Sequence, residues 1–467
     1  MLLRLALTTF FIFLAVETTL SQTPLARPNI VFIITDDQRW DYLGMAGHPA
    51  LKTPNIDRIA EEGVWMKNFF TTTPLCSPSR ASFLTGLYPH RHGVINNDKL
   101  GLDVVSHRLL TWPRQLREAG YETAFIGKWH MGLDDSRRPG FDHWISFKGQ
   151  GAYIDGVVNE NGMRRQLTGY MTDYLNDQAV EFVKRSRTRP FALVFSHKAV
   201  HYPYLPARRH DSQYKEYSYQ VPTVQEEELE GKPMLTRETP AFRWYEIEGV
   251  APEPGESRRG RAGDPSSIIR DQLRSLSSVD EGVGRLLDAL EELGQLDSTV
   301  FVYTSDNGYL MGEHGRFNDK RWAYDPSIRV PLLIRYPPLI PPGSIRRQLV
   351  LNIDLAPTFL ELAGVEPLEP MHGESVVPLF RDPQAPWRKA ILAEYFLEKV
   401  APRVPSWQCV RSEQWKYIRY TDESDLFDEL YDLEADPEEL RNLASDPASR
   451  ENLQQMRREL DRMLKKF

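Results

Sequence analysis

The chain has 467 residues, of which 41% are hydrophobic and 26% are charged, a globular composition that excludes disorder, collagen and coiled coil as descriptions of the whole chain. Its net charge of −8 provides no general attraction for nucleic acid or an anionic membrane, so we expect no nucleic-acid partner. A polyanionic ligand would need a local basic pocket. The two cysteines, Cys76 and Cys409, allow at most one disulfide, and either thiol could instead be reactive.

The N-terminus has the pattern of an export signal. Arg4 precedes the apolar run Leu5–Val16, which is too short for a comfortable membrane span. Thr19 and Ser21 are small enough for cleavage before Gln22. We therefore predict a signal peptide at residues 1–21, a periplasmic or secreted protein and no stable membrane anchor. An uncleaved N-terminal anchor is the alternative.

Four predicted strands each end in a cluster of polar residues. In chain order these are Asn29–Thr35 before Asp36 and Asp37, Tyr121–Ile126 before Lys128 and His130, Phe191–Ser196 before His197 and His201, and Thr299–Thr304 before Asp306 and Asn307. Apolar residues at helical spacing over 269–290, ending at Gly294, predict an amphipathic helix between the third and fourth of these strands. Strands that alternate with helices predict a largely parallel sheet covered on both faces, with ligands at the carboxyl ends of its strands.

The chain is predicted to have two parts. Residues 28–375 are expected to form the larger α/β domain, interrupted at 206–265 by a surface excursion rich in Glu, Arg and Pro. Residues 376–467 form a smaller α+β subdomain with a short antiparallel sheet. Its elements are expected at Ala390–Phe396, Trp407–Arg411, Trp415–Tyr420 and, as a terminal helix, Asn452–Leu464.

A helix is predicted to start beside Cys76. Ser77 suits the N-cap, Pro78 the first helical position and Gly86 the end. Cys76 would then lie at the positive end of the helix dipole with Arg80 one turn away, which favours a thiolate or another anion. A buried structural cysteine before an ordinary helix is the alternative from these residues alone.

The segment Cys76-Ser77-Pro78-Ser79-Arg80, followed by Leu84-Thr85-Gly86, resembles the signature of the formylglycine-dependent sulfatases of the alkaline phosphatase superfamily. The resemblance continues through Gly127-Lys128-Trp129-His130, Ser305-Asp306-Asn307-Gly308, Gly312-Glu313-His314-Gly315 and Lys320. It implies an alkaline-phosphatase-like fold and a separate maturation enzyme that oxidises Cys76 to Cα-formylglycine.

The same resemblance implies one divalent cation, usually calcium. Its ligands would be Asp36, Asp37, Asp306, Asn307 and the modified Cys76. Hard oxygen donors of this kind suit calcium or magnesium better than zinc. The competing interpretation is that these acidic and amide pairs only form turns.

The resemblance also assigns roles in sulfate ester hydrolysis. A hydroxyl of the hydrated aldehyde at position 76 attacks sulfur, and elimination then releases sulfate. Arg80 and Lys128 stabilise the diol, and His130 helps to remove the second hydroxyl's proton. Lys320 and His201 contact sulfate and assist the leaving group. His197 competes with His201 for this role, and His201 is preferred because it precedes Tyr202-Pro203.

The substrate is expected to be a sulfated carbohydrate. Pro139-Gly140-Phe141-Asp142, Gly149-Gln150-Gly151-Ala152-Tyr153 and His197–Pro203 are similar to bacterial N-acetylglucosamine-6-sulfatase-like members that act on glycosaminoglycans. His372 departs from the aspartate that relatives often have there. Four aromatic residues could stack on a sugar or belong to the core: Trp144, Tyr153, Tyr202 and Trp322.

Three alternative functions stay open from the sequence. One is a phosphate or phosphonate monoester hydrolase of the same superfamily, and another is a different carbohydrate sulfatase, such as an iduronate-2-sulfatase or arylsulfatase. The third is a secreted carbohydrate-binding protein in which Cys76 is never oxidised. The sequence does not indicate an oligomeric state.

Overall fold

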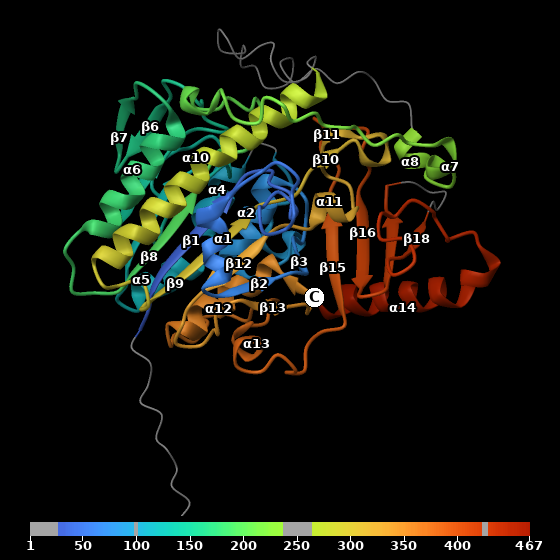
Figure 1. The fold of residues 1–467 in the computed structure, drawn as a ribbon. Coiled ribbons are helices and arrows are strands. Elements are labelled where there is room, and N and C mark those ends of the chain that lie inside the picture. Colours follow the sequence, from blue (N-terminus) through green and yellow to red (C-terminus); the bar gives the residue numbers. More distant parts are fainter. Residues whose placement is uncertain (1–26, 98–100, 237–263, 423–427) are drawn as a thin grey trace, which may run out of the picture.

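The computed structural model describes residues 27–97, 101–236, 264–422 and 428–467. The predicted signal peptide at residues 1–21 lies outside this range. None of the helices within it has the length and apolar character needed to cross a membrane. A ten-stranded sheet forms the larger part of the molecule, and a four-stranded sheet lies beside it (Figure 1).

The ten-stranded sheet has the strand order β13-β2-β12-β9-β1-β8-β4-β5-β6-β7. Its strands are β1 (Asn29–Thr35), β2 (Val64–Met66), β4 (Glu122–Gly127), β5 (His143–Ser146), β6 (Val157–Glu160), β7 (Met163–Gln166), β8 (Phe191–Ser196), β9 (Thr299–Ser305), β12 (Leu332–Arg335) and β13 (Ser344–Arg346). The central strands β9, β1, β8, β4 and β5 are parallel, and Ile33 pairs with Phe195 on one side and Tyr303 on the other. This confirms the mostly parallel sheet and places the four predicted strand ends at one edge.

Helices cover both faces of the sheet, as predicted. Val31 and Ile33 of β1 pack in one buried cluster with α1 (Pro54–Glu61), α6 (Met171–Lys184) and α10 (Pro265–Glu292). Phe32 and its neighbours on the opposite face pack with α2 (Cys76–Thr85), α5 (Trp112–Glu118) and α12 (Leu355–Leu362). Because β1 is buried on both faces, its sequence is a continuous apolar run instead of an alternating one.

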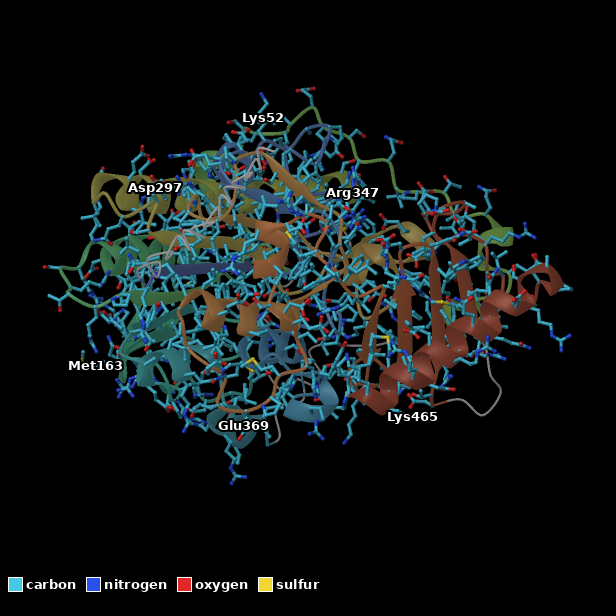
Figure 2. All side chains as sticks on the ribbon, turned by 90° about the horizontal axis from the view of Figure 1, so that it is seen from below. Lys52, Met163, Asp297, Arg347, Glu369 and Lys465 are labelled. Atoms are coloured by element: carbon cyan, nitrogen blue, oxygen red, sulfur yellow. The ribbon has the colours of Figure 1, made fainter. Side chains whose placement is uncertain are left out.

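The smaller sheet is antiparallel, in the order β15 (Ala390–Tyr395), β16 (Trp407–Ser412), β17 (Trp415–Tyr420) and β18 (Glu429–Asp432). The terminal helix α14 (Arg450–Lys466) packs on β16 and β17 through Leu453, Met456, Leu460 and Met463. Cys409 is a buried residue of β16, as predicted. Met163 of β7 lies at the end of the molecule that is far from the smaller sheet (Figure 2).

Short elements connect the two sheets. The described part of the 206–265 excursion contains η1 (Arg208–His210), α7 (Glu226–Leu229) and α8 (Pro233–Thr236), and residues 237–263 lie outside the described range. Met234 and Leu235 of α8 are buried in the core of the smaller sheet. β10 (Leu310–Met311) pairs with β11 (Phe317–Asp319) beside the larger sheet, while α13 (Val377–Arg381) packs with the core of that sheet. The domain boundary at 375/376 stays a prediction.

Candidate active site at the strand ends

Helix α2 presents Cys76 at its first residue. The prediction that Ser77 caps the helix and Pro78 begins it is wrong, because the cap residue is the extended Leu75, whose side chain makes no capping hydrogen bond. The Ser77 hydroxyl instead donates to the backbone oxygen of His130, at 2.6 Å. Gly86 ends the helix in the left-handed conformation, as predicted. The Ser77 bond thus fixes the start of α2 against the turn that follows β4.

Three aspartates from two neighbouring strand ends meet beside Cys76. Asp36 and Asp37 follow β1, Asp306 follows β9, and all three are fully buried. Their carboxylate oxygens come within 4.8 Å of one another, and the same limit holds for ligand atoms of Asp36, Cys76 and His201. Asn307 lies in the same group, since its Nδ2 donates to Asp37 Oδ1 at 2.6 Å.

Buried cations surround these acids. Arg80 Nε donates to Asp306 Oδ2 at 2.9 Å, and Lys128 Nζ forms an ion pair with Asp36. Lys320 Nζ contacts both Asp37 Oδ1, at 2.5 Å, and Cys76 Sγ, at 3.0 Å. This is the local basic environment that an anionic ligand would need in a chain whose overall charge is negative.

Two of the three predicted histidines belong to this site. His201 Nε2 lies 3.7 Å from Asp37 Oδ2, and its Nδ1 lies 2.6 Å from the backbone oxygen of Tyr202. His130 lies in the turn fixed by Ser77, and its buried Nδ1 has no hydrogen-bond partner among the described residues. Burial, with the neighbouring charge of Lys128, lowers the pKa of both His130 and His201 well below the usual value, so both rings are neutral at pH 7.

His197 has a different environment. It is fully buried, its ring centroid is 4.2 Å from that of Phe195, and burial lowers its pKa to about 3. The structure therefore places His201, and not His197, against the acidic cluster.

The start of α2 does not favour a thiolate at position 76, although the helix dipole and Arg80 were expected to do so. Burial raises the pKa of the Cys76 thiol to about 12, even though Lys128 and Lys320 act in the opposite direction. The helix dipole and nearby cations thus fail to offset desolvation of the anion. The unmodified thiol is protonated at neutral pH and is a weak nucleophile.

The acidic cluster fits a divalent cation. Burial, reinforced by Asp36, raises the pKa of Asp306 to about 7, so the buried site disfavours a third negative charge. Asp37 Oδ2 and Asn307 Oδ1 are buried without a hydrogen-bond partner in the described parts of the chain. Oxygen donors held together in this way suit calcium or magnesium.

The aromatic candidates divide between core and surface. Trp144, Tyr153 and Trp322 are fully buried, so their rings belong to the interior, whereas Tyr202 is partly exposed. The Tyr153 hydroxyl donates to the backbone oxygen of His201 at 2.7 Å. His372 lies near the far end of α2, where its backbone nitrogen donates to the Gly86 oxygen at 2.9 Å.

Sequence reasoning missed three residues that support the site. Ser196 bonds to Arg80, Asn97 accepts a hydrogen bond from the Ser77 amide, and Glu398 binds both Asn97 and Arg321. No local pattern marks any of them, because each partner is distant in the chain.

Comparisons with known proteins agree with this geometry. The profile of the sulfatase family matches residues 28–365, and that of the N-sulphoglucosamine sulphohydrolase C-terminal family matches residues 312–466. The N-acetylglucosamine-6-O-sulfatase of Bacteroides thetaiotaomicron is 34% identical over 89% of this chain and 82% of its own length. The N-acetylglucosamine-6-sulfatase of Homo sapiens is 31% identical over 90% of this chain and 81% of its own.

A solved structure gives the same result. A protein in complex with its substrate D-glucosamine-2-N,6-O-disulfate superposes with a TM-score of 0.82 and 31% identity, over 94% of this chain and 98% of that one. The family profile covers well over half of the chain, and the relatives are matched over most of their length. The chain therefore belongs to the sulfatase family of the alkaline phosphatase superfamily and is a sulfuric ester hydrolase that acts on carbohydrates.

Proposed function

We propose that this sulfatase is exported and removes 6-O-sulfate from N-acetylglucosamine units of glycosaminoglycans, using a formylglycine formed from Cys76 and one calcium ion. The observation that carries the proposal is the position of Lys320 Nζ, 3.0 Å from Cys76 Sγ and 2.5 Å from Asp37 Oδ1. A cation, the cysteine that we propose as the precursor of the nucleophile and a carboxylate that we propose as a metal ligand thus meet in one buried place.

The two groups that the sequence family implies fit the residues present. Asp36, Asp37, Asp306, Asn307 and position 76 would hold calcium, which when bound withdraws charge from the sulfate oxygens. Formylglycine at position 76 supplies, as its hydrate, a hydroxyl nucleophile that a protonated, buried thiol does not offer. The calcium ion would bind buried oxygens that have no hydrogen-bond partner among the described residues, and the formylglycine would replace a thiol that is a weak nucleophile.

The surrounding side chains would then have separate roles in stabilising charge and in transferring a proton. Arg80 and Lys128 orient position 76 and balance the negative charge beside it. Neutral His130, with a free Nδ1 among the described residues, accepts a proton from the residue at position 76. Lys320 and His201 hold the sulfate oxygens and stabilise negative charge on the departing alcohol oxygen. Burial strengthens each of these interactions, because little water competes for the charges.

The choice of substrate rests on likeness. Two curated relatives above 30% identity are N-acetylglucosamine-6-sulfatases, and the similar solved structure holds a glucosamine that carries both 2-N and 6-O sulfates. The export of the chain and its maturation by a formylglycine-generating enzyme rest on the pattern of residues 1–21 and on the motif around Cys76.

Mass spectrometry of the peptide containing Cys76, made in a host with the maturation enzyme, tests the nucleophile. We expect the mass of formylglycine; only thiol, in a preparation that still releases sulfate, would refute the formylglycine. Sulfate release should then be compared on N-acetylglucosamine-6-sulfate, glucosamine-2-N,6-O-disulfate and 2-O- or 4-O-sulfated sugars. Loss of the 2-N sulfate first would refute the 6-O assignment, and a preference for an aryl phosphate over the matched aryl sulfate would refute the sulfatase proposal itself.

A further inference from the structure

The segment that carries Lys320 is held by the C-terminal part of the chain. Arg321, the next residue, has a left-handed backbone with φ of 84°, a conformation that a side chain with Cβ adopts at an energetic cost. Trp407 Nε1 donates to the Arg321 backbone oxygen at 2.8 Å, and Glu398 Oε2 accepts from Arg321 Nε at 2.6 Å. Arg403 adds an ion pair with Asp319, at 2.7 Å. Residues 319–321 are thus held in place by side chains of residues 398–407, from the C-terminal part of the chain.

Glu398 also reaches the start of α2. Its second oxygen, Oε1, accepts from the Asn97 amide at 3.0 Å, and Asn97 Oδ1 accepts from the Ser77 amide at 3.0 Å. Cys76 precedes Ser77 in the chain, and its Sγ contacts Lys320 Nζ. The contacts therefore form a closed ring, which returns to Glu398 through Arg321. Glu398 is the link that joins the Cys76 side of this ring to the Lys320 side.

The chemistry of the link favours a fixed geometry. The Glu398 side chain is fully buried and that of Arg321 is 7% exposed, so this ion pair has little competition from water. Oε1 accepts from the Asn97 backbone amide, while Oε2 accepts from Arg321 and, at 3.3 Å, from the Tyr395 hydroxyl. Rotation of the carboxylate would break these hydrogen bonds, so Glu398 connects Asn97 to Arg321 and is not simply a counter-ion for Arg321.

We propose that Glu398 is a positioning residue for catalysis, which holds Lys320 against position 76 by tying Arg321 and Asn97 together. This inference deepens the proposed function and rests on it. If Glu398 has this role, the C-terminal subdomain contributes to the geometry of the catalytic site, although every predicted catalytic side chain comes from the larger domain.

Glu398→Gln keeps the size of the side chain and removes its charge. We expect kcat for sulfate release to fall by about 10- to 100-fold while KM changes by less than about threefold, because misplacement of a catalytic group acts mainly on the transition state. Rates are divided by the formylglycine content of each preparation. Asp428→Asn is the matched control, since Asp428 is a buried carboxylate of the same subdomain that binds Arg457 and Tyr417 away from the site. Its kcat should equal that of the wild type.

A double-mutant cycle separates positioning from general destabilisation. If Glu398 acts through Lys320, Glu398→Gln should lower kcat far less in a Lys320→Arg background than in the wild type. Equal loss in both backgrounds, or wild-type kcat in Glu398→Gln alone, would overturn the proposal. Arg321→Lys keeps the charge but loses the Nε contact, and it serves the same test should Glu398→Gln fail to fold.

Crystal structures of the wild type and of Glu398→Gln, or of Arg321→Lys in its place, provide a readout that does not depend on activity. Displacement of Lys320 Nζ away from residue 76 in the variant supports the positioning role, and an unmoved lysine refutes it. A wild-type enzyme that carries formylglycine and releases no sulfate would contradict the proposed function, while the crystal comparison would still decide the role of Glu398.

Discussion

The protein buries two clusters of charged side chains, and they differ in how their charges are balanced. The cluster at the proposed active site, called the catalytic cluster below, contains Asp306, whose pKa burial and Asp36 raise to about 7. The C-terminal cluster contains Asp325, which accepts hydrogen bonds from Arg411 and Lys416. Those two cations overcome the effect of burial and lower the pKa of Asp325. Burial also raises the pKa of Glu439, in the C-terminal cluster, to about 7, but Glu439 Oε1 lies 2.5 Å from Lys416 Nζ. The two clusters thus differ in their oxygens, because Asp37 Oδ2 and Asn307 Oδ1 of the catalytic cluster have no hydrogen-bond partner in the described parts of the chain.

This difference indicates a difference in purpose. Charges that only connect two elements are best balanced by partners in the chain, because a buried charge without a partner is costly. A site that binds an additional cation must keep donor oxygens in reserve, as Asp37 Oδ2 and Asn307 Oδ1 are in the described residues. Buried charge alone would not have separated the two clusters, whereas the state of the individual oxygens does.

One cysteine lies beside each cluster, and we expect the largest difference in sulfate release between the alanine variants of these two cysteines. Both are buried, and burial raises the pKa of each thiol to about 12. Cys76→Ala should lower sulfate release by at least about 10⁴-fold, because it removes the nucleophile. Cys409→Ala should leave kcat unchanged and lower the free energy of unfolding by about 1 kcal/mol. Both are measured by sulfate release and urea unfolding, and substantial activity in Cys76→Ala would refute the assignment.

Asp325→Asn should disrupt the C-terminal cluster. Arg411 and Lys416 would remain buried with their main counter-charge removed, so the free energy of unfolding should fall by about 3–5 kcal/mol. Chemical denaturation measures this loss. Wild-type stability in Asp325→Asn would show that the two clusters do not differ as described.

Removal of calcium should affect the catalytic cluster alone. A chelator should abolish sulfate release, and calcium at about 100 times its Kd should raise the free energy of unfolding by about 2.7 kcal/mol. Thermal unfolding with and without calcium measures the shift. Asp306→Asn should remove most of the shift and Asp325→Asn should retain it. A calcium shift of the same size in Asp306→Asn would exclude Asp306 as a ligand.

Asp280 is a buried aspartate outside both clusters, and its substitution is expected to have a smaller effect on stability. Asp280 of α10 accepts hydrogen bonds from the backbone amides of Asn55 and Ile56, in the first turn of α1, and burial raises its pKa to about 6. Since the folded protein favours the protonated form, the associated stability is present below about pH 4 and is lost as the pH rises through about 6.

Asp280→Asn does not titrate, so the difference in unfolding free energy should shift in favour of the variant by about 2 kcal/mol between pH 4 and pH 7.5. Urea unfolding at the two pH values measures this shift. Parallel pH profiles for the variant and the wild type would contradict it.

Much of the fold could be predicted because the relevant signals are local. The four strands before the polar clusters appear within one residue of their predicted ends, and α10 carries the predicted apolar face. The start of α2 was misplaced because a sequence shows which residues can cap a helix, but not which tertiary partner, here the His130 carbonyl, competes for the Ser77 hydroxyl.

The sequence by itself determined the larger sheet, its ligand-binding edge and the residue types that meet there. The hydrophobic period follows from neighbouring residues, and the shared edge follows from the rule that parallel strands end together. Only the tertiary structure showed that burial raises the pKa of the unmodified Cys76 thiol and that Glu398 contacts both Asn97 and Arg321. Desolvation and long-range hydrogen bonds depend on what surrounds an atom in space, and a motif does not contain that information.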